Sequence, residues 1–237
     1  MNSKKILVLG ASSDIGIKLI KEILKKTDME IYAHYSSSSS ELKKIKHENL
    51  KIFKADFSKI NEKNFNTIFK KLFKLKFDYF VNLVGYVKKS NFSNFTLKNV
   101  NQTFNINVFI PNLILSNIVK NMLKNKFGRI LNCSSIGIKF GGSSQTYTYS
   151  FSKYAIEFIP TNFKEWAKKN VLINNLRIGV TDTKIHKKIG KDLNQRVKMI
   201  PINRAAKKIE IVKYILFLIS QENSFTTGQT ISISGGE

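Results

Sequence analysis

Seven short runs of β-branched and apolar residues alternate with segments of helical periodicity, and this alternation constrains the fold more than any other feature of the chain. After the first run, Ile15, Leu19 and Ile23 recur every four residues, which places them on one face of a helix. Strands that alternate with helices form βαβ units, which build a parallel sheet with right-handed crossovers. The sequence therefore predicts an α/β, Rossmann-type doubly wound fold with helices on both faces of about seven strands, at residues 5–9, 31–34, 51–54, 79–83, 129–133, 172–177 and 230–233.

The chain has 237 residues and no linker or internal repeat that would divide it, so we expect a single domain over residues 1–237. Hydrophobic residues make up 42% and charged residues 24%, which is ordinary globular composition and argues against a membrane protein. The most apolar stretch, residues 211–219, is too short for a membrane span and contains Lys213. Cys133 is the single cysteine, which excludes an internal disulfide framework and favours a reducing, cytoplasmic location.

The chain is strongly basic, with 40 Lys and Arg against 16 Asp and Glu, a formal net charge of +24. Such a charge attracts nucleic acid, anionic lipid or an acidic protein partner. A nucleic-acid site is usually a concentrated stripe with arginines and exposed aromatic residues, whereas these basic residues are mostly lysines spread along the whole chain. The pattern favours a compositional bias over a nucleic-acid function.

A glycine-containing turn, Gly10-Ala-Ser-Ser-Asp-Ile-Gly16, follows the first predicted strand and opens the first predicted helix. Gly10 permits a tight turn, and Gly16 lets the helix approach the strand closely. The N–H groups at the start of that helix can then bind a pyrophosphate. Similar turns also occur in α/β proteins that bind nothing there, so this signal alone leaves both interpretations open.

Tyr149 and Lys153 are four residues apart in a segment predicted to be helical, so their side chains share one face of the helix. A tyrosine titrates near pH 10 and exchanges protons poorly at neutral pH unless a nearby cation stabilises its phenolate. A lysine one turn away can supply that cation. The same spacing also arises by chance in a lysine-rich chain, so an exposed pair without function remains the alternative.

The order of these signals resembles the short-chain dehydrogenase/reductase family, and the likeness extends over almost the whole chain, to the single-domain branch that contains 3-oxoacyl carrier-protein reductases. The glycine turn resembles the family's Thr-Gly-x-x-x-Gly-x-Gly, with Asp14 in place of the middle glycine. The resemblance implies an NAD(P)(H)-dependent oxidoreductase that interconverts a carbonyl and a secondary alcohol by hydride transfer. The alternative is a non-catalytic module on the same fold that senses a cofactor or binds nucleic acid.

The resemblance also implies four catalytic residues. Ser135 would bind the substrate oxygen, Tyr149 would exchange its proton, and Lys153 would lower the pKa of Tyr149 and bind the nicotinamide ribose. Asn107 would position a water of the proton relay, and Pro111 supports this role because a proline has no N–H to bond the Asn107 carbonyl four residues back.

Cofactor-binding residues follow from the same resemblance. Asn82-Leu-Val-Gly85 is similar to the family's Asn-Asn-Ala-Gly motif, and the segment after Asn174 resembles the nicotinamide cap, with Ile178 where proline is usual. The predicted cofactor-binding residues are Gly10, Ser12, Ser13, Asp14, Ile15, Gly16, Ser36, Ser37, Asp56, Asn82, Gly85, Tyr149, Lys153, Gly179 and Thr183.

Cofactor choice is decided where the second strand ends. An acidic residue there would accept both ribose hydroxyls of NAD and repel a 2′-phosphate. Here the strand runs into residues 36–40, all serine, and no Asp or Glu precedes Glu41. The sequence predicts NADP as the preferred cofactor and NAD as the second candidate, with Ser36 and Ser37 as contacts, helped by Lys43 or Lys44.

Partners are less well defined by the sequence. His34, His47 and His186 have no partners at metal-ligand spacing, so we predict no metal and treat them as structural or surface residues.

The substrate-facing loops, residues 141–148 and 184–200, have no pattern that identifies a ligand, and the second has the composition of a mobile lid. An acidic carrier protein or a nucleotide sugar suits the basic charge. The family resemblance implies a homotetramer that packs long helices, including the one bearing Tyr149, against their symmetry mates.

Overall fold

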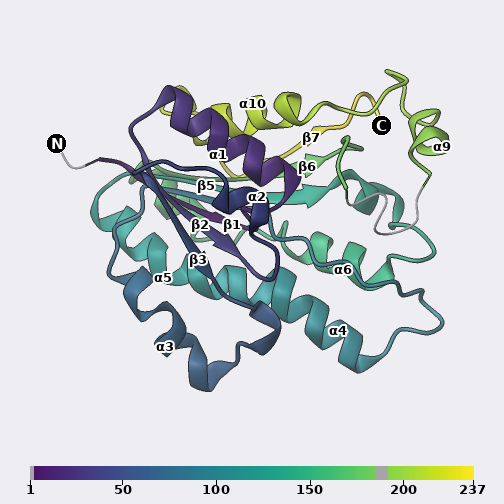
Figure 1. Ribbon diagram of the computed structural model, residues 1–237, viewed down its shortest axis with the longest axis horizontal. Helices are drawn as coiled ribbons and strands as arrows, with labels where there is room; N and C mark the ends of the chain where they lie inside the picture. Colours follow the sequence, from purple (N-terminus) through teal and green to yellow (C-terminus); the bar gives the residue numbers. More distant parts are fainter. Residues whose placement is uncertain (1–2, 185–191) are drawn as a thin grey trace.

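A computed structural model describes residues 3–184 and 192–237, and a seven-stranded parallel sheet lies at its centre (Figure 1). The strand order is β3-β2-β1-β4-β5-β6-β7. All seven predicted strands are present, with ends within two residues of those expected: β1 (Lys5–Leu9), β2 (Glu30–Tyr35), β3 (Leu50–Lys54), β4 (Tyr79–Asn82), β5 (Gly128–Ser135), β6 (Val171–Ile178) and β7 (Thr230–Ile233). The first three strands run outward from β1 to the edge at β3, and the chain then returns to place β4 on the other side of β1. This reversal opens a crevice at the carboxyl ends of β1 and β4.

Helices connect the strands, as the predicted alternation requires. Their bounds are α1 (Asp14–Lys26), α2 (Ser40–Lys43), α3 (Glu62–Phe73), α4 (Leu97–Phe104), α5 (Ile110–Lys124), α6 (Tyr147–Ala155), α7 (Phe163–Ala167), α9 (Leu193–Val197) and α10 (Lys208–Ile219). Two short 3₁₀ turns, η1 (Phe57–Lys59) and η3 (Ile136–Phe140), follow β3 and β5. A π-helical turn, η2 (Asn105–Phe109), joins α4 to α5.

The helices form a layer on each face of the sheet, which confirms the predicted doubly wound fold (Figure 1). Side chains alternate along β1 between the two layers. Leu7 and Leu9 pack in one core with residues of α3 and α5, while Ile6 and Val8 pack in the other with residues of α1 and α10. Each strand at the centre is therefore buried on both faces.

The continuous helical run from Leu97 to Lys124 is long and apolar enough to cross a membrane by length and composition, although the sequence analysis identified no such segment. In the fold, half of its most apolar window is buried. Ile114, Ile118 and Met122 of α5 are each at most 1% exposed and belong to the core against the sheet. The run is therefore accounted for as a core helix of the α/β sandwich.

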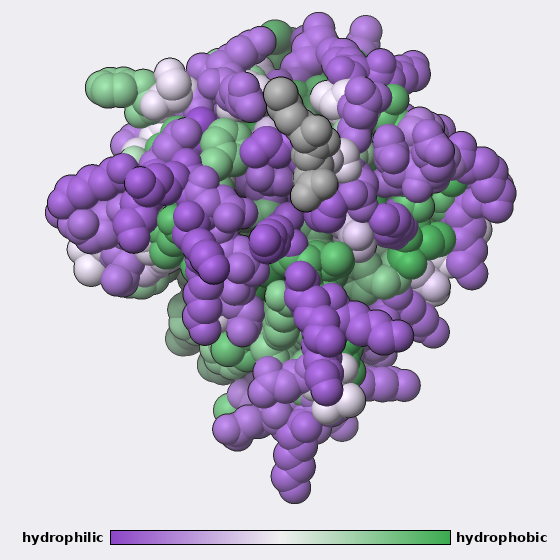
Figure 2. Space-filling model, turned by 90° about the vertical axis from the view of Figure 1, so that its left-hand side faces the viewer, coloured by the Kyte–Doolittle hydropathy of each residue, from purple (hydrophilic) through white to green (hydrophobic). Residues whose placement is uncertain are grey.

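The surface is polar over the face that lies on the left of Figure 1. Figure 2 shows hydrophilic side chains over most of this face, with small apolar areas between them. This dispersed polarity agrees with lysines that are spread along the sequence instead of forming one stripe.

Candidate active site

A cleft of about 1750 Å³ lies along the carboxyl ends of the strands. It brings together most of the predicted site, and the residues that line it are Gly10, Ser12, Ser13, Asp14, Ile15, Ser36, Ser37, Asp56, Gly85, Ser135, Tyr149, Lys153, Gly179 and Thr183. Gly16, Asn82 and Asn107 are not among the lining residues. Asn82 and Asn107 are each 1% exposed, and they act on the cleft through their neighbours.

The glycine turn has the close contacts that the sequence predicts. Gly10 has φ +71°, and a Cβ there would lie 2.8 Å from the main chain of Leu83. A Cβ at Gly16 would lie 2.5 Å from the carbonyl oxygen of Ala11. The Ser13 side chain caps α1 by accepting the N–H of Gly16 at 3.1 Å. The turn therefore presents the start of α1 to the cleft, where an anion is favoured.

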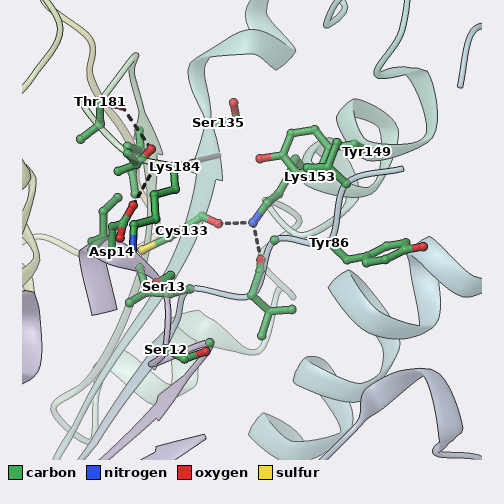
Figure 3. Close-up of a pocket in the computed structure, with 18 of the residues that line it drawn as sticks. Ser12, Ser13, Asp14, Tyr86, Cys133, Ser135, Tyr149, Lys153, Thr181 and Lys184 are labelled. Carbon is green, nitrogen blue, oxygen red and sulfur yellow. Dashed lines mark hydrogen bonds between the residues drawn. The ribbon is translucent and has the colours of Figure 1, made fainter. Parts of the chain in front are cut away.

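Asp14 is the first residue of α1, and its carboxylate occupies a position that favours negative charge. It accepts a hydrogen bond of 2.7 Å from the main-chain N–H of Lys184, which lies beside it (Figure 3). The carboxylate thus joins the glycine turn to the loop that follows β6. A phosphate bound at the start of α1 would be repelled by this charge.

The structure does not place Lys43 or Lys44 at the cleft, where the sequence predicted one of them to help bind the cofactor. Lys44 pairs with Glu41 at 2.6 Å, and neither Lys43 nor Lys44 lines the cleft. Lys18 and Lys21 of α1 do line it. The sequence analysis missed these two residues, although their spacing of four and seven from Asp14 on one helix could have revealed them.

Lys18 pairs with Glu22 at 2.7 Å, whereas Lys21 is near enough to Glu41 to help lower the pKa of that carboxyl, behind the larger effect of Lys44. Lys184 lines the cleft too and has a larger effect on Glu41 than Lys21 has, so both lysines are candidate cations at this part of the cleft.

Two polar residues shape the part of the cleft at the ends of β3 and β4. Asp56 accepts hydrogen bonds from the Ser58 hydroxyl at 2.7 Å and the Ser58 N–H at 3.1 Å, which lower its pKa. Asn82 accepts the N–H of Val84 at 3.1 Å and donates to Asn132 at 3.3 Å. Asn82 therefore fixes the turn after β4 that brings Gly85 to the cleft.

Ser135 and Tyr149 lie together at the other end of the cleft (Figure 3). Ser135 is the last residue of β5, and its hydroxyl accepts the N–H of Gly137 at 3.3 Å, so its position is fixed by the start of η3. Burial raises the pKa of Tyr149 to about 12, and the nearby hydroxyl of Ser135 offsets part of this increase. Tyr149 is therefore protonated at neutral pH and able to act as an acid.

Lys153 is 4% exposed, and its ammonium donates to the carbonyl oxygens of Val84 and Cys133, both at 2.7 Å (Figure 3). Burial lowers its pKa to about 8. An ammonium has three N–H donors, so one remains for another acceptor. Lys153 shares the helix α6 with Tyr149 as expected, but the hydrogen bonds of its ammonium go to main-chain carbonyls and not to the phenol.

Asn107 lies in the π-helical turn before α5 and holds the wall of the cleft through its side chain. Its amide oxygen accepts the N–H of Tyr86 at 2.7 Å, and its amide nitrogen donates to the Tyr86 carbonyl at 3.0 Å and to Ser152 at 2.9 Å. Ser152 donates in turn to the main-chain carbonyl of Tyr149 at 2.7 Å. The sequence analysis did not identify Tyr86, which follows Gly85 and lines the cleft.

The loop after β6 places Thr183 at the cleft, where its hydroxyl donates to the Thr181 carbonyl at 3.2 Å. The predicted lid covers residues 184–200. Its residues 185–191, which include His186, lie outside the described part of the chain. Among the described residues, no three His, Cys, Asp or Glu side chains come together as a metal site. Cys133 is 3% exposed, and burial raises the pKa of its thiol to about 12, so it is a core residue and a poor nucleophile.

This geometry defines a class of protein. A glycine turn at the switch point of a parallel sheet, with a serine and a Tyr–Lys helix across the same cleft, is typical of dinucleotide-dependent oxidoreductases. A family described as enoyl-(acyl carrier protein) reductase matches residues 10–237. The chain belongs to this family, within the short-chain dehydrogenases/reductases, which are NAD(P)-dependent oxidoreductases.

Individual relatives extend this result. The chain is 26% identical to a 3-oxoacyl-(acyl-carrier-protein) reductase of Aquifex aeolicus, over 100% of this chain and 98% of the relative. It is 30% identical to an acetoacetyl-CoA reductase of Shinella zoogloeoides, over 99% of this chain and 98% of the relative. A solved structure of 4-hydroxyisoleucine dehydrogenase complexed with NADH has the same fold, with a TM-score of 0.86, 24% identity and coverage of 99% and 98%. These comparisons confirm the predicted family and fold.

Proposed function

We propose that this single-domain chain reduces a carbonyl to a secondary alcohol with NADPH, by acid catalysis from Tyr149. The observation that carries the proposal is the placement of Ser135 and Tyr149 side by side on the cleft, with the ammonium of Lys153 buried next to them. A protonated phenol beside a second hydroxyl is the arrangement that a developing alkoxide requires.

The residues of the glycine turn fit a dinucleotide. Gly10 and Gly16 leave no room for a Cβ, and the capped start of α1 faces the cleft. Ser12 and Ser13 would hold the pyrophosphate there, Gly85 would line the adenosine side, and Gly179 and Thr183 would enclose the nicotinamide. When bound, the nicotinamide supplies the hydride.

Each residue of the catalytic end then has a defined role. Ser135 donates a hydrogen bond to the substrate carbonyl and holds it beside Tyr149. Tyr149 gives its proton to the oxygen as negative charge develops there. Lys153 stabilises the resulting phenolate and uses its third N–H for a ribose hydroxyl. Asn107 fixes Tyr86 and, through Ser152, the main chain at Tyr149, and its carbonyl would hold the relay water.

The preference for NADPH rests on charge. No acidic residue precedes Glu41 after β2, and Ser36, Ser37 and Lys21 line the cleft. Glu41 lines it as well, but its charge is paired with Lys44. Hydroxyl groups and a cation bind a 2′-phosphate, whereas a carboxylate would repel it. Steady-state kinetics with both cofactors test this choice. We expect a kcat/KM about tenfold or more in favour of NADPH, and a ratio that favours NADH would refute it.

For the substrate, we propose a 3-oxoacyl thioester carried by an acidic protein. The relatives named above are reductases of 3-oxoacyl-carrier and acetoacetyl-CoA thioesters, and the net charge of +24 suits an acidic carrier. The test is the loss of nicotinamide absorbance with acetoacetyl-CoA, a 3-oxoacyl carrier protein and a keto nucleotide sugar. Turnover of the sugar alone would reassign the substrate. Salt-dependent binding of random DNA or RNA without any turnover would favour the non-catalytic alternative, to which the comparisons lend no support.

The assembly and location complete the proposal. Phe109 and Leu113 of the α5 region and Phe151 of α6 are each about half exposed, at 52%, 46% and 47%. These side chains would pack against a second copy in a cytoplasmic homotetramer. Light scattering at micromolar concentration in moderate salt tests this, because salt screens the repulsion between basic subunits. A monomeric mass would contradict it.

A further inference from the structure

His34, at the end of β2, bridges two parts of the cleft wall that are far apart in the sequence. Its side chain is buried, with the residue 3% exposed, yet the residue borders the cleft. The N–H of Gly10 donates to its Nδ1 at 3.2 Å, and its Nε2 lies 2.8 Å from the carbonyl oxygen of Ala55. The ring therefore spans from the glycine turn to the residue that precedes Asp56.

The environment fixes the ring in one tautomer. Burial lowers the pKa of His34 to about 4, so the imidazole is neutral at physiological pH. The nitrogen that faces the Gly10 N–H must be unprotonated, and the nitrogen that faces the Ala55 carbonyl must carry the hydrogen. His34 Nε2–H therefore donates to Ala55 while Nδ1 accepts from Gly10. The main-chain donor at Gly10 requires an acceptor nitrogen on the ring, and the main-chain acceptor at Ala55 requires a donor nitrogen.

Two further contacts hold the ring in place. It stacks on Phe57 of η1, with ring centroids 4.3 Å apart and an angle of 7° between the planes. The main-chain carbonyl of His34 accepts the N–H of Ala11 at 2.9 Å. Residue 34 thus binds two consecutive N–H groups of the glycine turn, one through its main chain and one through its side chain.

We propose that His34 is a positioning residue for the cofactor, which sets the distance between the glycine turn and the Ala55–Asp56 turn and thereby determines affinity for the adenosine half of the dinucleotide. The proposal rests on the proposed function. His34 lies at the end of the cleft away from Tyr149, and its two hydrogen bonds go to main-chain atoms. It therefore supports cofactor binding and leaves the proton transfer to the other end.

Three variants separate the two hydrogen bonds. His34→Asn keeps an oxygen near the position of Nδ1, which can still accept from Gly10. His34→Gln keeps an N–H near the position of Nε2, which can still donate to Ala55. His34→Leu has similar bulk and makes neither bond. His47→Gln is the matched control, because His47 is an exposed histidine in the loop before β3.

The measurements are calorimetric titrations of the full chain with NADPH and with 2′,5′-ADP, together with kcat at saturating NADPH. We expect His34→Leu to weaken both ligands about tenfold or more, His34→Asn and His34→Gln to weaken them by less, and His47→Gln to change neither. The kcat at saturation should change less than about threefold in all four variants.

Unchanged affinity in the Asn and Gln variants together, or a loss confined to kcat, would overturn the role of His34, even if the Leu variant did not fold. Failure of the unmodified protein to bind NADPH or 2′,5′-ADP would instead refute the proposed function, so the two failures are distinguishable.

Discussion

The two ends of the cleft are formed by different kinds of structure. At the catalytic end, Ser135 ends a central strand, Tyr149 and Lys153 lie on α6, and the side chain of Lys153 is fixed by bonds to buried main-chain carbonyls. At the phosphate end, the groups that face the cleft belong to a glycine turn and a serine loop, and many of them are main-chain N–H groups or short side chains.

This difference predicts how the two ends respond to substitution. Burial at the catalytic end shifts the pKa values of Tyr149 and Lys153, so a change there should alter the chemical step. A change at the phosphate end removes one of several weak contacts or a charge, and it should alter cofactor affinity. A substitution at the catalytic end that alters only cofactor affinity, or one at the phosphate end that alters only the chemical step, would contradict this difference.

The largest expected effect is that of Tyr149→Phe. The change removes the proton-donating oxygen and little volume, so turnover should fall about 10²–10⁴-fold while the Kd for NADPH stays nearly constant. Tyr154→Phe, on the exposed side of the same helix at 65% exposure, is the control and should retain full activity. More than about a tenth of the original rate in Tyr149→Phe would contradict the assignment.

A pH effect of intermediate size should come from Lys153. Since burial lowers its pKa to about 8, the residue is an ammonium below that pH and neutral above it. The kcat/KM for reduction should therefore fall about tenfold per pH unit above pH 8. Lys153→Met should be less active below pH 8 and lack this limb, whereas the exposed Lys168→Met should keep the original profile. A limb that persists in Lys153→Met would assign the titration to another group.

The lowered pKa of Lys153 also predicts that stability increases with pH, whereas activity decreases. Between pH 8 and the ordinary lysine pKa near 10.5, the folded chain holds Lys153 neutral while the unfolded chain still binds its proton. The unfolded state then binds more protons, so Lys153 makes the free energy of unfolding rise with pH in this window. The difference in denaturant midpoint between the unmodified protein and Lys153→Met, followed from pH 7.5 to 10.5, should change in that direction.

A smaller effect is expected at the phosphate end, from Asp14. Asp14→Asn removes a negative charge from the start of α1 and keeps an oxygen that can accept the Lys184 N–H. The Kd for NADPH should fall about threefold to tenfold, and the gain should shrink at high salt. A weaker affinity would show that the carboxylate helps to hold the cofactor, and kcat at saturation should not change.

The smallest effect is one of stability alone. Ser13→Ala removes the hydroxyl that caps α1, which should cost about 1 kcal/mol and lower Tm by about 2–4 °C in the absence of cofactor. Ser12→Ala is the control, because the N-cap of α1 is Ser13 and not Ser12. Equal values of Tm for the two variants would contradict the cap.

The sequence predicted the placement of Tyr149 and Lys153 better than the placement of the lysines near the serine loop. Runs of β-branched residues located all seven strands, and a single helical spacing put Tyr149 and Lys153 on one helix. The partners of Lys153 could not be predicted, because Val84 and Cys133 bind it through main-chain oxygens that any residue type would offer.

At the phosphate end, the sequence suggested Lys43 and Lys44 because they are near the serine loop along the chain. Lys18 and Lys21 of α1 line the cleft instead, and they precede the serine loop by a whole strand in the sequence. His34 was interpreted as a structural or surface residue for a related reason, since a strand pattern gives the face of a side chain but not the hydrogen bonds that its two nitrogens make.

The π-helical turn at Asn105–Phe109 has a consequence for how chains of this kind tolerate insertions and deletions. Its bonds span five residues where an α-helix spans four, so the turn holds one residue more than the helices on either side of it. Each residue advances an α-helix by about 100°, so deletion of one residue here would rotate α4 relative to α5 by roughly that angle. Asn107 would then turn away from Tyr86 while α5 stayed on the sheet. A change of length in these five residues should therefore be lethal to the site, whereas one in the exposed loop around His47 should be neutral.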